Sequence, residues 1–206
     1  MRRRAVAIAL VLAAAAGSAG GVLAARLHTH ANRPSLPAFH GQLSWGSGRR
    51  PAPNFTLVDQ RGAALSLSSL RGRPVLLTFL DSRCTSDCPI EARQLAAVLH
   101  RVPTAKRPVV VIVSVDRTGD TRSSIAKAVH KWHLDGPWTV RWVNGSQARL
   151  SAVWSSYGIA VRLASHDIVH GMALYLIDRA GDERTAYLFP FLPGFLTTDL
   201  DRLAAT

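Results

Sequence analysis

The chain has 206 residues, of which 25 are Lys or Arg and 13 are Asp or Glu, so its formal charge is +12. This length allows one ordinary domain with some additional sequence. Two cysteines are too few for a disulfide-dense small scaffold or a four-cysteine zinc site, and 48% hydrophobic residues with five tryptophans exclude a wholly disordered chain.

The first 26 residues have the features of a targeting segment. Three arginines follow Met1, and residues 5–25 contain no charge. Residues 5–16 have the length of a signal-peptide core, small residues follow them, and the whole uncharged stretch is about long enough to cross a bilayer. We predict that residues 1–26 are a signal peptide or an N-terminal membrane anchor and that the rest of the chain is on the extracytoplasmic side of the membrane, anchored or secreted.

Outside this segment the positive charge is dispersed. Four arginines lie in residues 1–26, so the remainder carries +8. The other basic residues occur singly or in pairs, such as Arg49-Arg50, and no basic stripe is interleaved with aromatic residues. This pattern argues against a nucleic-acid partner and indicates a solvated basic surface that anionic lipid head groups could attract.

Residues 27–50 are rich in Pro, Gly, Ser and His without periodicity, which predicts a flexible tether before a globular domain at 51–206. Strands alternate with helices in that domain, and an antiparallel hairpin comes near its end, which predicts a three-layer α/β domain with a mixed central sheet. In chain order we expect strands at 55–58 and 74–80, a helix around 95–102, a strand at 108–115, a helix around 125–132, a strand at 139–143, a helix around 150–157, a hairpin of 172–177 and 185–189, and a helix at 198–205.

The two cysteines follow the first strongly apolar strand. Cys84 and Cys88 lie where this strand ends and the next helix begins, with Ser86 or Asp87 as the N-cap and Pro89 in the first turn. Sites in α/β sheets form at this edge, and a helix N-terminus stabilises a thiolate. The neighbouring Arg83 is expected to add a positive charge with the same effect.

The spacing of the cysteines leaves two chemistries open. Residues four apart on a helix have Cβ atoms about 5–6 Å apart, whereas a relaxed disulfide needs about 3.5–4.5 Å. A disulfide therefore requires loop adjustment, while two sulfurs can meet on one ion. Thiolates with an imidazole favour copper over hard cations, and two thiolates alone require a further ligand. A structural disulfide or two inert thiols is the simpler alternative.

Three motifs, in this order, resemble the Sco/SenC family: Cys84-x-x-x-Cys88-Pro89, Val113-Ser114-Val115-Asp116 and His170-x4-Tyr175-Leu176-Ile177-Asp178. The resemblance covers about residues 51–203 and implies a thioredoxin-like fold. It also implies that Cys84, Cys88 and His170 bind one copper ion, as Cu(I) or Cu(II), which is delivered to the CuA site of cytochrome c oxidase. The partner would be the oxidase subunit that carries CuA, or another redox or copper-transfer protein.

Other candidate residues carry weaker signals. His166 lies four residues before His170, which is a metal-pair spacing on a helix, but the following residues are typical of a strand entry. Asp116 either orients a partner or the site, or caps the turn that follows it. We expect Met172 to lie in the core.

The alternative hypothesis is an extracytoplasmic thiol-disulfide oxidoreductase that uses Cys84 and Cys88 without a metal, so the sequence leaves open whether the protein is an enzyme. A third hypothesis is a purely structural exported module. A peroxiredoxin is disfavoured, because its Pro-x-x-x-Thr-x-x-Cys motif has Asp81 in place of Pro when Thr85 and Cys88 are aligned to it.

Overall fold

The computed structural model describes residues 39–164 and 167–205, and the predicted targeting segment lies outside them. These residues contain no helix that is long and apolar enough to cross a membrane. Their α-helices are α2 (Cys88–Arg101), α3 (Arg122–Lys131), α4 (Gln147–Ser156) and α5 (Pro193–Leu203), with short 3-10 helices η1 (Leu67–Leu70) and η2 (Thr104–Lys106).

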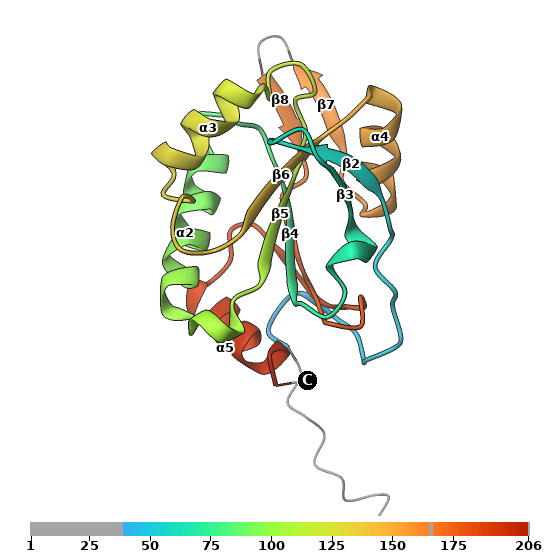
Figure 1. The fold of residues 1–206 in the computed structure, drawn as a ribbon, viewed down its shortest axis with the longest axis vertical. Coiled ribbons are helices and arrows are strands. Elements are labelled where there is room, and N and C mark those ends of the chain that lie inside the picture. The colour runs from blue at the N-terminus through green and yellow to red at the C-terminus, as the bar shows by residue number, and fades with distance from the viewer. Residues whose placement is uncertain (1–38, 165–166, 206) are drawn as a thin grey trace, which may run out of the picture. The chain divides into compact units, whose positions relative to one another are not determined.

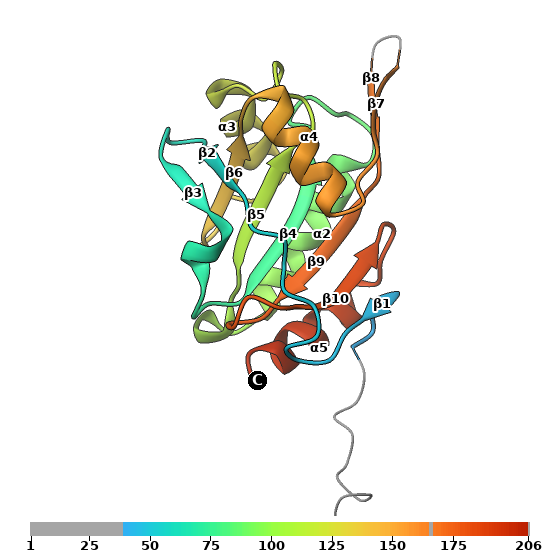
Figure 2. The ribbon, with the colours of Figure 1, turned by 90° about the vertical axis from the view of Figure 1, so that its right-hand side faces the viewer.

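Eight strands of the described residues form one mixed sheet (Figures 1 and 2). In spatial order they are β1 (Leu43–Ser44), β10 (Glu183–Leu188), β9 (Ala173–Ile177), β4 (Val75–Leu80), β5 (Val109–Ser114), β6 (Val140–Asn144), β2 (Thr56–Asp59) and β3 (Ala64–Ser66). The central β4, β5 and β6 are parallel, and the flanking strands pair antiparallel. The mixed sheet predicted from the sequence is confirmed.

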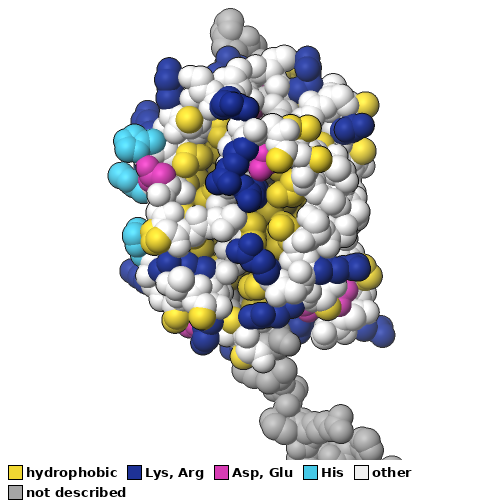
Figure 3. Space-filling view, in the orientation of Figure 1, with side chains coloured by type: hydrophobic (Ala, Val, Ile, Leu, Met, Phe, Trp, Pro, Cys, Tyr) yellow, Lys and Arg dark blue, Asp and Glu magenta, His cyan; other side chains and the backbone are white. Residues whose placement is uncertain are grey.

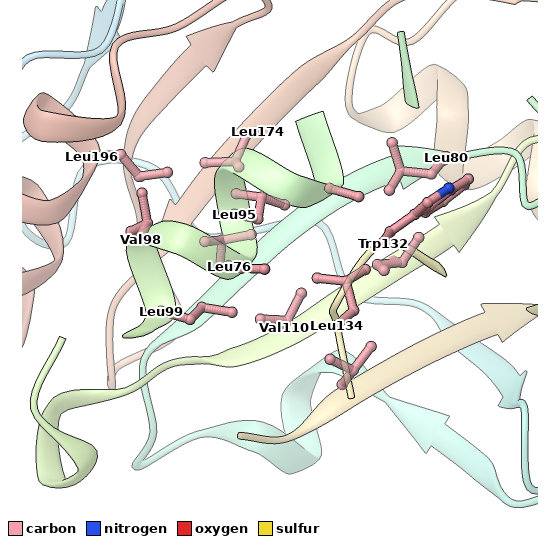
Figure 4. Close-up of a cluster of buried hydrophobic side chains, with 14 of the residues drawn as sticks. Leu76, Leu80, Leu95, Val98, Leu99, Val110, Trp132, Leu134, Leu174 and Leu196 are labelled. Carbon is pink, nitrogen blue, oxygen red and sulfur yellow. The ribbon is translucent and has the colours of Figure 1, made fainter. Parts of the chain in front are cut away.

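Helices cover both faces of this sheet and complete three layers. The side chains of β4 alternate between two core clusters, because successive residues of a strand point to opposite faces. Leu76 and Leu80 pack with α2, α3 and α5, whereas Phe79 packs with α4 and η1. Figure 4 shows the first cluster, in which Leu76 of β4 meets Leu95 of α2 near Leu196 of α5. Both β4 and β5 are buried at every position, as their apolar sequences predict.

The folded unit begins earlier than the sequence predicts. It starts at Phe39 rather than at Pro51, so residues 39–50 belong to it and not to the predicted tether. β1 pairs with β10, and the Nε atom of Arg50 donates a 2.5 Å hydrogen bond to Glu183 Oε2. A two-residue strand has no periodicity that a sequence could reveal, and its pairing depends on a partner about 140 residues away.

A second, two-stranded sheet was not predicted. β7 (Val161–Ala164) and β8 (Asp167–His170) form an antiparallel hairpin that projects from the edge of the domain where β4 ends (Figure 2). Residues 167–170 are therefore a strand, as the sequence indicates for the entry to this region, and not a helix. His166 lies outside the described residues.

Candidate functional site

The cysteine pair lies at the junction of β4 and α2. Cys84 occupies the intervening loop, where its backbone N–H donates to Asp81 O at 3.2 Å, and Cys88 is the first residue of α2. Asp87 is the N-cap residue and Pro89 stands in the first turn, as predicted, although the Asp87 side chain makes no capping hydrogen bond. Because Cys84 precedes the helix, the separation of two helical residues does not apply to this pair.

The hairpin of β7 and β8 brings a histidine to these thiols. His170 ends β8, and its Nε2 atom lies 3.6 Å from the Sγ atom of Cys88. The Nδ1 atom of the same ring lies 3.1 Å from the backbone oxygen of Gly171. A carbonyl only accepts hydrogen bonds, so the neutral ring that satisfies this contact carries its proton on Nδ1 and leaves the Nε2 lone pair for a metal ion. This is the tautomer that can bind a metal ion through Nε2.

The two thiols differ in charge state. The pKa of Cys84 is lowered to about 5, mainly because the Cys88 thiol donates a hydrogen bond to its sulfur. The Ser86 hydroxyl and the backbone N–H groups of Cys88 and Ser86 lower this pKa further. Partial burial of Cys84 raises it and offsets part of the effect. The pKa of Cys88 is raised, because it keeps its proton for Cys84 and because it is buried. At neutral pH the pair therefore holds one thiolate and one thiol.

Arg83 does not have the role that the sequence predicts. Its Nε donates to Asp116 Oδ2 at 2.9 Å, and its Nη2 contacts the same oxygen. Asp116 also accepts from Gly119 N at 2.8 Å and from the Thr118 hydroxyl, so it caps the turn that follows β5. Arg83 is not among the main causes of the low Cys84 pKa. Its charge is paired with Asp116, and hydrogen bonds stabilise the thiolate instead.

Two buried carboxyl groups beside the site were missed in the sequence. Glu91 lies one helical turn after Cys88, and burial raises its pKa to about 7 although Thr78 Oγ1 donates to it at 2.5 Å. Asp120 accepts from Ser82 N at 2.7 Å, and burial raises its pKa to about 6. The signal for Glu91 was its position on the apolar stripe of α2, three residues from Cys88 and four from Leu95.

The predicted ligands are only partly assembled. Within the described residues, no group of three or more His, Cys, Asp and Glu side chains is close enough to hold a metal ion as it stands. Cys88 is the shared neighbour, because His170 Nε2 lies 3.6 Å from its sulfur and its thiol is the main cause of the lowered pKa of Cys84. Met172 is half-buried against the core cluster, as predicted. Other histidines have separate partners: His40 contacts Asp199, and His130 contacts Asp135.

Comparisons with known proteins give two kinds of relative. The chain is 29% identical over 153 residues to peroxiredoxin Q of Oryza sativa subsp. japonica, which is 74% of this chain and 63% of that protein. It is 27% identical over 137 residues to the SCO2 homolog of Bos taurus, which is 62% of this chain and 50% of that protein. The chain thus matches less than two thirds of the length of these curated relatives.

Among solved structures, ScoI of Arabidopsis thaliana with copper bound has the same fold. The TM-score is 0.66 at 21% identity, over 75% of this chain and 98% of that chain. The similarity to peroxiredoxin Q, at 29% identity over 63% of that protein, does not by itself place the chain in that family. In addition, Asp81 stands where the peroxiredoxin motif has proline. The family model of SCO1/SenC matches residues 47–205. Because this match includes the whole cysteine and histidine site and most of the chain, the protein belongs to the SCO1/SenC family.

Proposed function

We propose that this protein is a copper metallochaperone that binds its cargo through Cys84, Cys88 and His170. The contact between Cys88 Sγ and His170 Nε2, at 3.6 Å across 82 residues of sequence, carries this proposal. Two sulfurs and an imidazole are a soft donor set that suits copper. The Arabidopsis relative of the same fold holds copper.

The charge states of the ligands favour stepwise binding of the cargo. Cys84 is a thiolate at neutral pH and offers the first ligand, whereas Cys88 loses its proton only when copper arrives. The lone pair of His170 Nε2 then supplies the third ligand. Cys84 is half-buried at the surface, so a partner's ligand can approach it and accept copper by ligand exchange.

Copper titration tests the proposal. The reduced protein is titrated with Cu(I) against a competing chelator, alongside Cys84→Ser, Cys88→Ser and His170→Ala. Each substitution is expected to weaken copper binding by at least about tenfold, since even residues that only support a metal ligand contribute about 10–100-fold. The control is His130→Ala, whose ring contacts Asp135 elsewhere. Unchanged affinity in the three site variants would exclude the copper role.

We further propose that copper is delivered to the CuA site of cytochrome c oxidase from the extracytoplasmic side of the membrane. The family match supports the delivery role, and the charge pattern of residues 1–26 supports export. Mixing the copper-loaded protein with the apo CuA-bearing domain should transfer copper, followed by the CuA spectrum. Fusing residues 1–50 to a reporter enzyme that is active only after export should produce activity, and an inactive fusion would contradict export.

A thiol-disulfide oxidoreductase is the second candidate, and the thiolate–thiol pair favours it. The Cys84 thiolate would attack a partner disulfide and expel one partner thiolate. Cys88 would then attack the mixed disulfide, so that the partner leaves fully reduced and Cys84–Cys88 is oxidised. His170→Ala separates the two functions, because it should weaken copper binding by at least about tenfold and leave disulfide exchange intact. Failure to exchange with glutathione or thioredoxin couples would exclude this candidate.

A further inference from the structure

Two loops form one connected unit beside the cysteine pair. β4 and β5 are parallel neighbours that end level with each other, Leu80 opposite Ser114, so the loops at 81–87 and 115–121 leave the sheet side by side. The Ser82 N–H donates to Asp120 Oδ1 at 2.7 Å, and the Ser82 hydroxyl donates to Ser124 Oγ at 2.9 Å. These cross-loop bonds hold the segment that carries Arg83 and Cys84.

Arg83 is held in place yet exposed. Its side chain is 61% exposed, whereas that of its partner Asp116 is 5% exposed. A Cβ atom at Gly119 would lie 1.8 Å from Asp116 Oδ2 and 2.1 Å from Arg83 Nε, so the guanidinium rests directly against this glycine. Its Nε and Nη2 atoms contact Asp116, and within the described residues no hydrogen-bond acceptor reaches its Nη1 atom. One edge of the guanidinium is therefore presented to a ligand, one residue before Cys84.

Exposed positive charge exceeds exposed negative charge in the loops beside the thiols. Arg117 follows in the neighbouring loop and is exposed, whereas Arg122 at the start of α3 is directed to the β2–β3 turn, where its Nη2 atom donates to Arg61 O at 3.3 Å. The carboxylates of this region are buried: Asp81, Asp116 and Asp120. Asp87 is the exposed one in the two loops. The same imbalance holds across the described surface, where at least eight of the 13 acidic residues are buried but Arg184 is the single buried basic residue. Figure 3 shows Lys and Arg side chains spread over one face on which Asp and Glu are sparse.

An exposed leucine lies on the opposite side of the cysteine pair. β9 and β5 flank β4 on its two sides, so the hairpin that precedes β9 stands across from the loops that carry the arginines. Leu163 is 82% exposed and lies on the same face of the hairpin as His170, because Val161 pairs with His170 and strand residues alternate. The thiols thus lie between the hairpin that carries Leu163 and the two loops that carry Arg83 and Arg117.

We propose that Arg83 and Arg117 recognise carboxylates on a partner protein whose acceptor sulfur is flanked by acidic residues. The proposal deepens the function proposed above and rests on the cysteine pair being the exchange site. An acidic protein fits better than a neutral one, because an arginine fork binds a carboxylate through paired hydrogen bonds and the surrounding surface repels cations. Arg83 would position the incoming sulfur or ligand group over Cys84.

Two synthetic peptides test this recognition without copper. Each carries one cysteine as a mixed disulfide with 2-thiopyridine, flanked by two Glu in one peptide and two Gln in the other. Attack by the Cys84 thiolate on the peptide sulfur forms a protein–peptide disulfide and releases pyridine-2-thione, whose absorbance gives the rate; Cys88 then closes the Cys84–Cys88 disulfide and frees the peptide thiol. The Glu peptide should react about fivefold faster or more at low salt, and less so at high salt.

The variants are Arg83→Gln and Arg117→Gln, with Arg101→Gln as the matched control at the far end of α2. The ratio of Glu to Gln rates should fall towards one in the first two and stay unchanged in the control. In the described structure the Asp116 carboxylate pairs with Arg83 and not with Arg117, so the Arg117 variant remains informative if Arg83→Gln unfolds. An unchanged ratio in both, or an equal fall in Arg101→Gln, would overturn the proposal. Copper affinity should be the same in all three variants, so a failed copper titration would remove the chaperone role and leave this result standing.

Discussion

At the scale of single residues, the site depends on asymmetry between two chemically identical side chains. Cys84 lies in a half-exposed loop and receives hydrogen bonds, whereas Cys88 is buried at the helix start and donates one. The accessible sulfur is therefore the one that we propose as nucleophile or first ligand, and the buried sulfur lies beside His170. This division of roles follows from a helix that begins at the second cysteine rather than before the first.

The low pKa of Cys84 can be tested by removing its main donor. In Cys88→Ala the Cys84 pKa should rise from about 5 towards its ordinary range near 8.5, because the Cys88 hydrogen bond is the largest cause of the depression. The pH dependence of alkylation by iodoacetamide measures it. Ser86→Ala, which removes a lesser donor, should give a smaller rise. A Cys84 pKa that stays near 5 in Cys88→Ala would contradict this origin.

Glu91 should make stability depend on pH. Its pKa is about 7 in the fold and about 4.5 when unfolded, so the unfolded chain loses the proton first. The stability that protonated Glu91 gives to the fold is therefore intact below about pH 4.5. As the pH rises from there to about 7, the free energy of unfolding falls by about 3 kcal/mol on account of this group. Denaturant unfolding at pH 5 and pH 8 measures the difference. Glu91→Gln should show little of this difference between pH 5 and pH 8. If the variant loses as much stability as the original protein over this range, other groups cause the pH dependence.

At the scale of elements, the sequence predicts neither the hairpin of β7 and β8 nor strand β1, and the two lie in different parts of the fold with different effects. The hairpin of β7 and β8 supplies His170, whose imidazole lies against the sulfur of Cys88. β1 closes the other edge of the sheet by pairing with β10, far from the cysteines. One element determines the chemistry of the site and the other determines where the folded unit begins.

Attachment of the β1 segment depends on Gly41. A Cβ atom there would lie 2.2 Å from Thr185 Oγ1 and 2.4 Å from the backbone oxygen of Ala186, and the backbone of β10 cannot move aside. Gly41→Ala should displace residues 39–44 and lower the free energy of unfolding by about 1–3 kcal/mol. Hydrogen exchange of β10 amides measures the displacement. Gly46→Ala, whose Cβ would meet only the Arg49 side chain at 3.2 Å, should have little effect.

At the scale of the whole molecule, the folded unit buries its acids and exposes its bases. Buried carboxylates such as Glu183 and Asp199 fasten the N-terminal residues of the unit, through Arg50 and His40. The described residues contain 20 Lys and Arg and 13 Asp and Glu, and because at least eight of these acids are buried, the exposed charge of the described surface is mostly positive. That surface determines the solubility of the folded unit and the charge that a partner meets.

Truncation tests the revised boundary. A chain of residues 51–206 lacks β1 and Arg50, and leaves Glu183 buried without its partner. It should be less stable than residues 39–206 by about 1–3 kcal/mol for the unpaired acceptor alone. Thermal unfolding of both chains, followed by circular dichroism, measures this. Full-length protein with Arg50→Leu should reproduce part of the loss, and equal stability of the two chains would restore the boundary at Pro51.

The sequence by itself determined the central sheet, the helices and the cysteine pair. Apolar runs such as Val75–Leu80 and Val109–Ser114 report burial through local composition, and the helix after Cys88 reports its start through Asp87 and Pro89. These features are readable because each depends on neighbours within a few residues. His170 was identified through the family resemblance, since its distance from the cysteines in sequence hides any contact.

Only the tertiary structure decided which charges and strands meet. Arg83 is next to Cys84 in sequence, but its guanidinium pairs with Asp116 across the gap between two parallel strands. β1 is a strand only because β10 offers it backbone hydrogen bonds, and Glu91 is buried only because α2 packs on β4. Such contacts join residues that are far apart in the chain, and no local pattern of residues encodes them.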